Sequence, residues 1–266
     1  ALSATDEERE RSENLDVGYD PEERTWELIV RHSGSLAGLA GAGIQVDELL
    51  NGYAVLVVPE HLMDQVSELN QIEYIEKPKR LFFASNMARA ASCLSVVQSP
   101  SGTGNVTGGI ISGLSGGLTG RGVLVAVIDS GIDYLNQDFR NEDGSTRILM
   151  LMDQDRGRIY TREEINEALD APDRAGALER VPSVDLSGHG TAVAAIAAGN
   201  GRGSQGVYRG VAYESDLLVV KLGAPLADNF PRTTQLMKGL DFVIRQAQEL
   251  GRPVAVNLSF GNTYGS

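Results

Sequence analysis

The sequence has 266 residues, of which 42% are hydrophobic and 22% are charged, a balance typical of globular proteins. Aspartate and glutamate number 36 against 23 lysines and arginines, and the net charge of −13 argues against a nucleic-acid partner or an anionic membrane. A single cysteine, Cys93, excludes an internal disulfide framework and a cysteine-rich zinc site. No segment has the roughly 18 consecutive apolar residues that a membrane span needs.

Both ends of the sequence suggest a piece of a longer protein. The first 24 residues are charged and show no apolar signal-peptide core, and residue 1 is Ala rather than Met. At the other end, Gly265 and Ser266 follow a predicted strand with no sign of a domain end. We therefore expect a trimmed start and a fragment.

The N-terminal part of the sequence predicts a flexible arm followed by a small folded domain. Residues 1–23 are polar and acidic, which favours a loosely attached arm. Residues 24–83 contain two strand patterns joined by Asn51-Gly52, which is typical of a tight hairpin turn, and a helix pattern that Pro59 opens. Strands are expected at residues 26–32, 44–50, 53–58 and 72–76, and residues 33–43 form a short helix or a loop. This order of elements predicts a ferredoxin-like α+β domain.

Residues 84–118 are expected to be an exposed connector. They carry few large apolar side chains and are crowded with Ser, Gly, Ala and Thr. A flexible segment between two folded domains is the natural place for a proteolytic cut. The glycines from Gly108 to Gly122 precede the next strand instead of following it, so a phosphate-binding loop at a helix N-terminus is not expected.

Residues 119–266 alternate predicted strands with predicted helices, a pattern typical of a doubly wound parallel sheet. The first strand, residues 122–128, is an apolar run without alternation, which indicates burial on both faces. Further strands are expected at residues 147–152, 216–222 and 253–258, and helices at residues 161–171, 192–199 and 234–250. The fold class expected for the whole chain is α/β, with the small α+β domain ahead of the parallel sheet.

Asp129 ends the first of these strands, and Gly131 lets the backbone turn immediately afterwards. Open α/β sheets bind ligands and place catalytic groups at the carboxyl ends of their strands. An aspartate that caps the following turn would explain the same residues equally well. The choice between the two interpretations depends on His189.

His189 lies between two glycines at the start of a helix made of small residues, so its imidazole can project from a tight turn. The other histidines, His32 and His61, lie at the ends of elements, where a solvated surface residue is the simplest interpretation. A nucleophilic hydroxyl needs a base held in one tautomer by a carboxylate, and His189 and Asp129 supply these two parts. A structural histidine at a helix start is the alternative.

Four motifs follow one another in residues 119–266: VAVIDSGI at 125–132, GHGT at 188–191, GVA at 210–212 with VVK at 219–221, and VNLSFG at 256–261. Together they resemble the motifs of subtilisin-like serine proteases, the subtilase family. The resemblance implies that Asp129 orients the histidine and that His189 is the general base. It also implies a polypeptide substrate, whose backbone would pair with Ser259, Phe260 and Gly261 by β-augmentation.

The sequence departs from the family pattern where the nucleophile is expected. The Gly-Thr-Ser motif of the family and its oxyanion asparagine have no counterpart before the sequence stops, and Ser266 has no helix to hold it. Ala192 stands where many members have a second histidine. We therefore expect a serine endopeptidase as the full-length protein and an inactive fragment here.

Residues 24–83 resemble the inhibitor-type propeptide of subtilases. The resemblance implies a prodomain that assists folding, lays its C-terminal tail in the active-site cleft and stays there as a partner. Autocleavage in the connector is expected at Gln98 and Ser99. The insertion at residues 139–144 and the ending at 259–266 resemble the clostridial spore-germination subtilases of the Csp type, which implies a role in spore germination and a spore-associated or extracellular location.

No cofactor is expected to be required. Asp138 falls where subtilases often have a calcium ligand, and carboxylate oxygens suit calcium. A solvated aspartate in an acidic chain is the alternative for Asp138.

Two other functions compete with the protease. A pseudoprotease that serves as a signalling or scaffolding partner would keep the fold without a serine, and the retention of Asp129 and His189 counts against it. A nucleotide-binding or phosphoryl-receiving domain that uses Asp129 would need a second acidic pair before the strand and a phosphate-facing glycine loop after it. The sequence has neither feature.

Overall fold

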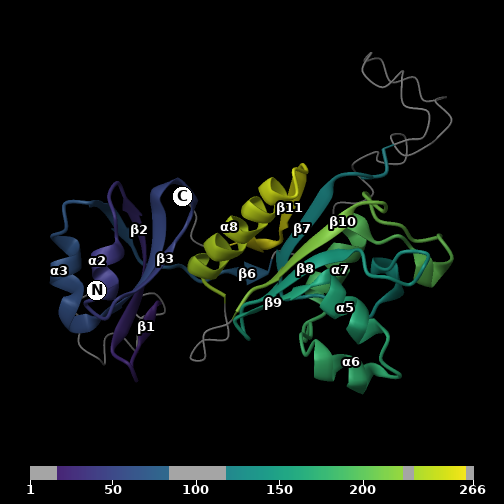
Figure 1. Ribbon diagram of the computed structural model, residues 1–266, viewed down its shortest axis with the longest axis horizontal. Helices are drawn as coiled ribbons and strands as arrows, with labels where there is room; N and C mark the ends of the chain where they lie inside the picture. The colour runs from purple at the N-terminus through teal and green to yellow at the C-terminus, as the bar shows by residue number, and fades with distance from the viewer. Residues whose placement is uncertain (1–16, 84–117, 224–230, 262–266) are drawn as a thin grey trace, which may run out of the picture. The chain divides into compact units, whose positions relative to one another are not determined.

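The computed structural model describes residues 17–83, 118–223 and 231–261 (Figure 1). The chain divides into two units. Of the described residues, 17–82, 231–242 and 261 belong to the N-terminal unit, and 83, 118–223 and 243–260 belong to the parallel-sheet unit. Most of the predicted arm and connector, including Gln98 and Ser99, lies outside the described residues.

The N-terminal unit is built on an antiparallel sheet in which β2 is central. Its strand order is β1-β2-β4-β3, and β5 pairs with β2 beside β1. The strands are β1 (Tyr19–Asp20), β2 (Thr25–His32), β3 (Gln45–Glu48), β4 (Tyr53–Pro59) and β5 (Ile72–Glu76). Two short helices, α2 (Ala37–Ala40) and α3 (Met63–Ser67), and two 3₁₀ turns, η1 (Leu50–Gly52) and η2 (Glu60–Leu62), complete it. The four longer strands and the two helices follow the predicted ferredoxin-like order.

The hairpin between β3 and β4 follows from its turn residues. Asn51 and Gly52 have φ angles of 61° and 73°, values that an Asn-Gly pair adopts at little cost. Strand β3 ends at Glu48, earlier than predicted, because the turn already begins at Leu50. Alternate residues of the strands face one core, since successive side chains of a strand point to opposite faces. That core contains Trp26, Leu28, Val30, Leu56 and Val58.

The parallel-sheet unit has the predicted α/β architecture. Its strand order is β11-β7-β10-β8-β9. The strands are β7 (Leu124–Asp129), β8 (Ile148–Asp153), β9 (Arg158–Thr161), β10 (Asp216–Lys221) and β11 (Val254–Leu258). Strands β11, β7, β10 and β8 are parallel, whereas β9 runs antiparallel to β8 at the edge. Every residue of β7 is buried, as its unbroken apolar run predicts.

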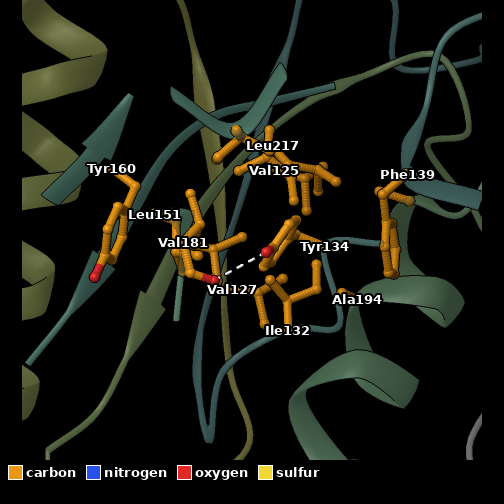
Figure 2. Packing of buried hydrophobic residues seen from close by; sticks show 14 of the residues in the cluster. Val125, Val127, Ile132, Tyr134, Phe139, Leu151, Tyr160, Val181, Ala194 and Leu217 are labelled. Atoms are coloured by element: carbon orange, nitrogen blue, oxygen red, sulfur yellow. Dashed lines mark hydrogen bonds between the residues drawn. The ribbon is translucent and has the colours of Figure 1, made fainter. Parts of the chain in front are cut away.

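Three helices cover one face of this sheet (Figure 1). They are α5 (Arg162–Leu169), α6 (Arg174–Arg180) and α7 (His189–Ala198). Figure 2 shows the core beneath them, where Val125 and Val127 of β7 pack with Leu217 of β10 and Ala194 of α7. The longest helix, α8 (Thr233–Glu249), has residues in both units.

Tyr134 anchors the segment around α6 to the loop after β7. Its hydroxyl donates to the carbonyl oxygen of Val181 at 2.9 Å, the bond drawn in Figure 2, and lies 3.0 Å from that of Ala177. The side chain is buried, and this burial raises the pKa of Tyr134 to about 12. The remaining elements are η3 (Gln137–Phe139), η4 (Arg202–Ser204) and the two strands β6 (Phe82–Phe83) and β12 (Phe260–Gly261), which pair with each other.

Candidate active site

The structure brings Asp129 and His189 together. Asp129 is the last residue of β7 and is 0% exposed, and His189 is the first residue of α7 with a side chain that is 26% exposed. Nδ1 of His189 lies 2.8 Å from Oδ1 of Asp129. Because a carboxylate can only accept, Nδ1 carries the proton and the lone pair of the neutral imidazole is on Nε2. The pair therefore has the tautomer that a general base needs.

The side chain of Asp129 is held by the residue that follows it. Its Oδ1 also accepts from the backbone N–H of Ser130 at 2.7 Å. Lys221 is its register partner on β10, and Gly131 turns the backbone away from the strand with a φ of 120°. Oδ2 of Asp129 is buried and accepts no hydrogen bond from any residue that the structure describes.

The glycines around His189 allow α7 to approach this loop closely. Gly188 starts the helix in the left-handed region, with a φ of 72°, which glycine adopts without strain. A Cβ on Gly190 would overlap the carbonyl oxygen of Gly131 and lie 3.1 Å from Cβ of Asp129. The absence of a side chain at Gly190 is therefore a steric condition for the contact between the acid and the base, whereas Gly188 is needed for its left-handed φ and has nothing within 4 Å of an added Cβ.

Asp185 is a site residue to which the sequence pattern assigned no role. It accepts from the N–H and the hydroxyl of Thr191 at 2.8 and 2.7 Å, and from the hydroxyl of Ser130 at 2.8 Å. Burial raises the pKa of the Asp185 carboxyl, but these hydrogen bonds and one from Gly188 outweigh it, so the pKa lies below its usual value. The available signal was an Asp just ahead of a helix, where carboxylates often accept from the first N–H groups.

Models of known protein families match both the N-terminal and the C-terminal parts of the chain. A family model described as the subtilase family matches residues 120–266, more than half of the chain. The chain belongs to the subtilase family. A second family model, the Csp protease B prodomain, matches residues 1–79, so this subtilase is of the Csp type.

Solved structures of subtilases are similar to the chain. The Clostridium perfringens CspB protease matches at 39% identity with a TM-score of 0.50, covering 56% of this chain and 31% of that one. The chain thus spans about a third of the length of that protease. Fervidolysin from Fervidobacterium pennivorans, a keratinolytic enzyme related to subtilisin, matches at 14% identity with a TM-score of 0.50, covering 88% of this chain and 35% of that one. The second likeness shows the subtilisin-like fold.

The segment predicted to bind the substrate of this subtilase follows β11. Ser259 is buried at 4% exposure, and its hydroxyl accepts from Nδ2 of Asn257 at 2.9 Å. Phe260 and Gly261 form β12, whose backbone pairs with β6. Substrate binding by these residues stays a prediction, and the predicted cleavage site lies outside the described residues.

Asp138, the predicted calcium ligand, accepts hydrogen bonds from two protein groups. Oδ1 of Asp138 accepts from the N–H of Gly203 at 2.7 Å, and Nη1 of Arg147 donates to the Asp138 carbonyl oxygen at 3.1 Å. Calcium takes about six to eight oxygen ligands. Among the described residues no three His, Cys, Asp or Glu side chains come together as metal ligands. Calcium binding at Asp138 stays a prediction.

None of the helices in the described part of the chain combines the length and the hydrophobicity that a bilayer span requires.

Proposed function

We propose that the full-length protein is a serine endopeptidase in which Asp129 and His189 activate a serine outside this chain. The 2.8 Å contact between Nδ1 of His189 and Oδ1 of Asp129 carries this proposal. Nε2 of His189 accepts the proton of the serine hydroxyl as the serine attacks the peptide carbonyl, and it later donates the proton to the leaving amine. The buried carboxylate of Asp129 stabilises the imidazolium that forms between these steps.

The substrate of the proposed enzyme is a polypeptide. The substrate would bind in an extended conformation as a strand added beside Ser259, Phe260 and Gly261. Its backbone would donate and accept main-chain hydrogen bonds with these residues. The pairing of β12 with β6 supports this role. It shows that the backbone of β12, the strand proposed to bind the substrate, can pair with another extended segment.

The Csp-type prodomain is the proposed internal partner of the protease. After autocleavage at Gln98 and Ser99, its C-terminal tail would remain in the active-site cleft as a product inhibitor. The match of residues 1–79 to the Csp protease B prodomain supports this assignment. On the same resemblance we assign the protein to spore germination, in a spore-associated or extracellular location.

The test uses the full-length protein with His189→Ala and, as a matched control, His61→Ala, which changes an exposed histidine. Parent and control should react with a fluorophosphonate serine probe and show connector cleavage by mass spectrometry. In His189→Ala, peptide cleavage should fall by about 10⁴-fold or more. Equal processing and labelling in both variants would contradict the proposal, and an inert parent would instead indicate a pseudoprotease.

A further inference from the structure

Asp185 accepts several hydrogen bonds at the carboxyl end of the parallel strands, where Asp129 and His189 lie. Oδ1 lies 2.8 Å from Oγ of Ser130, 3.0 Å from N of Gly188 and 3.2 Å from Oγ of Ser187. Oδ2 lies 2.8 Å from N and 2.7 Å from Oγ1 of Thr191. Each hydroxyl has one proton to donate. The Ser187 proton goes to Oγ of Ser130 at 2.8 Å, the shorter of its two bonds. The hydroxyls of Ser130 and Thr191 and two backbone N–H groups therefore donate to one carboxylate.

The Ser130 hydroxyl connects Asp185 to both members of the pair. Its proton goes to Asp185 at 2.8 Å rather than to Oδ1 of Asp129 at 3.2 Å, because only one of the two bonds can form and the shorter is favoured. As an acceptor, the same oxygen receives the N–H of Gly190 at 3.0 Å. Ser130 and Gly190 are the chain neighbours of Asp129 and His189, so this one hydroxyl fixes the backbone beside each of them.

Asp185 also supplies the helix cap that α7 lacks locally. Gly188, at the N-cap position, has no side chain to accept from the first N–H groups of the helix. Asp185 accepts from Gly188 and Thr191 instead. Oγ1 of Thr191 in turn accepts from the N–H of Asp133 at 2.8 Å, which ties the start of α7 to the loop after β7 a second time.

We propose that Asp185 is a positioning residue for this subtilase: it locks the start of α7 against the loop after β7 and so keeps His189 within bonding distance of Asp129. The inference deepens the proposed protease function and rests on it. Asp185 acts through Ser130 and Thr191 and does not itself touch the substrate.

The other charged residues near Asp185 provide a control variant for its substitution. Besides Asp129 and Asp185, Lys221 lies at the edge and pairs with Asp155 at 2.9 Å. Asp133 pairs with Arg174 at 3.3 Å. The variant Asp155→Asn removes one negative charge two residues after β8, the strand on the far side of β10 from β7. None of the hydrogen bonds described for Asp185 involves Asp155. This control separates the effect of losing a negative charge from the effect of losing the hydrogen bonds that Asp185 accepts.

The first experiment uses the 266-residue chain and observes the Nδ1 proton of His189 by NMR. In the parent and in Asp155→Asn this proton should be visible, since its bond to Asp129 slows exchange with water. In Asp185→Ala its exchange should accelerate at least about tenfold, and Asp185→Asn should lie between the two. Exchange in Asp185→Ala that equals the parent's would overturn the proposal.

A second variant, Thr191→Val, removes one of the four donors without touching Asp185. It should accelerate exchange in the same direction by a smaller factor, and circular dichroism melting checks that each variant is folded. If Asp185→Ala does not fold, Asp185→Asn and Thr191→Val decide: exchange at the parent's rate in both overturns the inference.

The second experiment measures peptide cleavage by the full-length protein. Asp185→Ala should lower kcat by about 10- to 100-fold with KM nearly unchanged, since the base is misplaced and the substrate strand is untouched. Asp185→Asn should recover part of the loss. A rise in KM at constant kcat would contradict a positioning role. A parent with no activity refutes the proposed function, while the NMR result still decides whether Asp185 holds His189.

Discussion

At the scale of single residues, the site depends on how closely α7 can approach the loop after β7. Gly190 occupies the tightest point, because a Cβ there would overlap the carbonyl oxygen of Gly131. Neither glycine can move freely. Gly131 follows Ser130, whose N–H donates to Asp129, and Gly190 lies in the first turn of α7. The contact between Asp129 and His189 is therefore sensitive to one methyl group.

Gly190→Ala should destabilise the chain by about 1–3 kcal/mol, the typical cost of overpacking, and should displace His189 from Asp129. The control is Gly38→Ala in α2, where nothing lies within 4 Å of the added Cβ and φ is not in the left-handed region. Urea unfolding followed by circular dichroism gives both values. Equal stability of Gly190→Ala and the parent would show that the helix does not pack this closely.

The depressed pKa of Asp185 makes part of the stability depend on pH. Because its pKa in the folded state lies below the unfolded value, its contribution is present above about pH 4 and is lost as the pH falls through the folded value. Asp185→Asn should therefore be less stable than the parent at pH 6, and the difference should shrink in more acidic buffer. Thermal melts of both proteins over this range measure it. A difference that grows on acidification would have the wrong sign.

The sequence could predict that Asp129 and His189 lie together because the first follows an apolar strand, the second lies between glycines, and both stand in motifs that resemble those of subtilases. Asp185 could not be ranked in the same way. Half of its donors are backbone N–H groups, which every residue except proline carries, and the Ser130 hydroxyl lies far away in the sequence. Only the fold brings these groups to one carboxylate.

At the scale of elements, the sequence predicted those helices and strands that have a clear local signal of their own. Helix α5 was predicted from Thr161 and its acidic first turn, and the structure shows a capping box between Thr161 and Glu164. Helix α6 and strand β9 were not predicted, because α6 has seven residues including Gly176 and β9 has four. Such short elements are stabilised by packing rather than by their own periodicity.

Strand β2 of the N-terminal unit carries a nearly buried ion pair that tests the packing of this unit. Oε2 of Glu27 lies 3.2 Å from Nη1 of Arg232 and 2.8 Å from Oγ1 of Thr234. The Glu27 and Arg232 side chains are 13% and 11% exposed. Removal of one partner of such a pair leaves the other charge without compensation, and this is more costly than the loss of the attraction itself.

Glu27→Ala should lower the free energy of unfolding by about 3 kcal/mol. Glu73→Ala is the matched control, since Glu73 pairs with Arg31 on the same sheet at 46% and 57% exposure and should contribute less than about 1 kcal/mol. Denaturant unfolding compares the two variants. Equal losses would mean that residues 231–242 do not pack on β2 as described.

At the scale of the whole molecule, the pattern of strands and helices predicted the α/β class but not the grouping of residues 231–242. These residues continue the alternation of the parallel-sheet domain in sequence, yet their described contacts group them with the N-terminal unit. The hydrogen bonds responsible, such as that from N of Leu81 to the carbonyl oxygen of Pro231, join backbone groups far apart in sequence. Local periodicity carries no information about such pairs.

The distance from Nε2 of His189 to the nearest serine Oγ, in a crystal structure of the full-length protein, tests the central claim most directly. The account predicts one serine about 3 Å from Nε2, on the side of the ring opposite Asp129. A structure in which Asp129 still binds Nδ1 but no serine hydroxyl comes within reach of Nε2 would contradict the assignment of this pair to peptide cleavage.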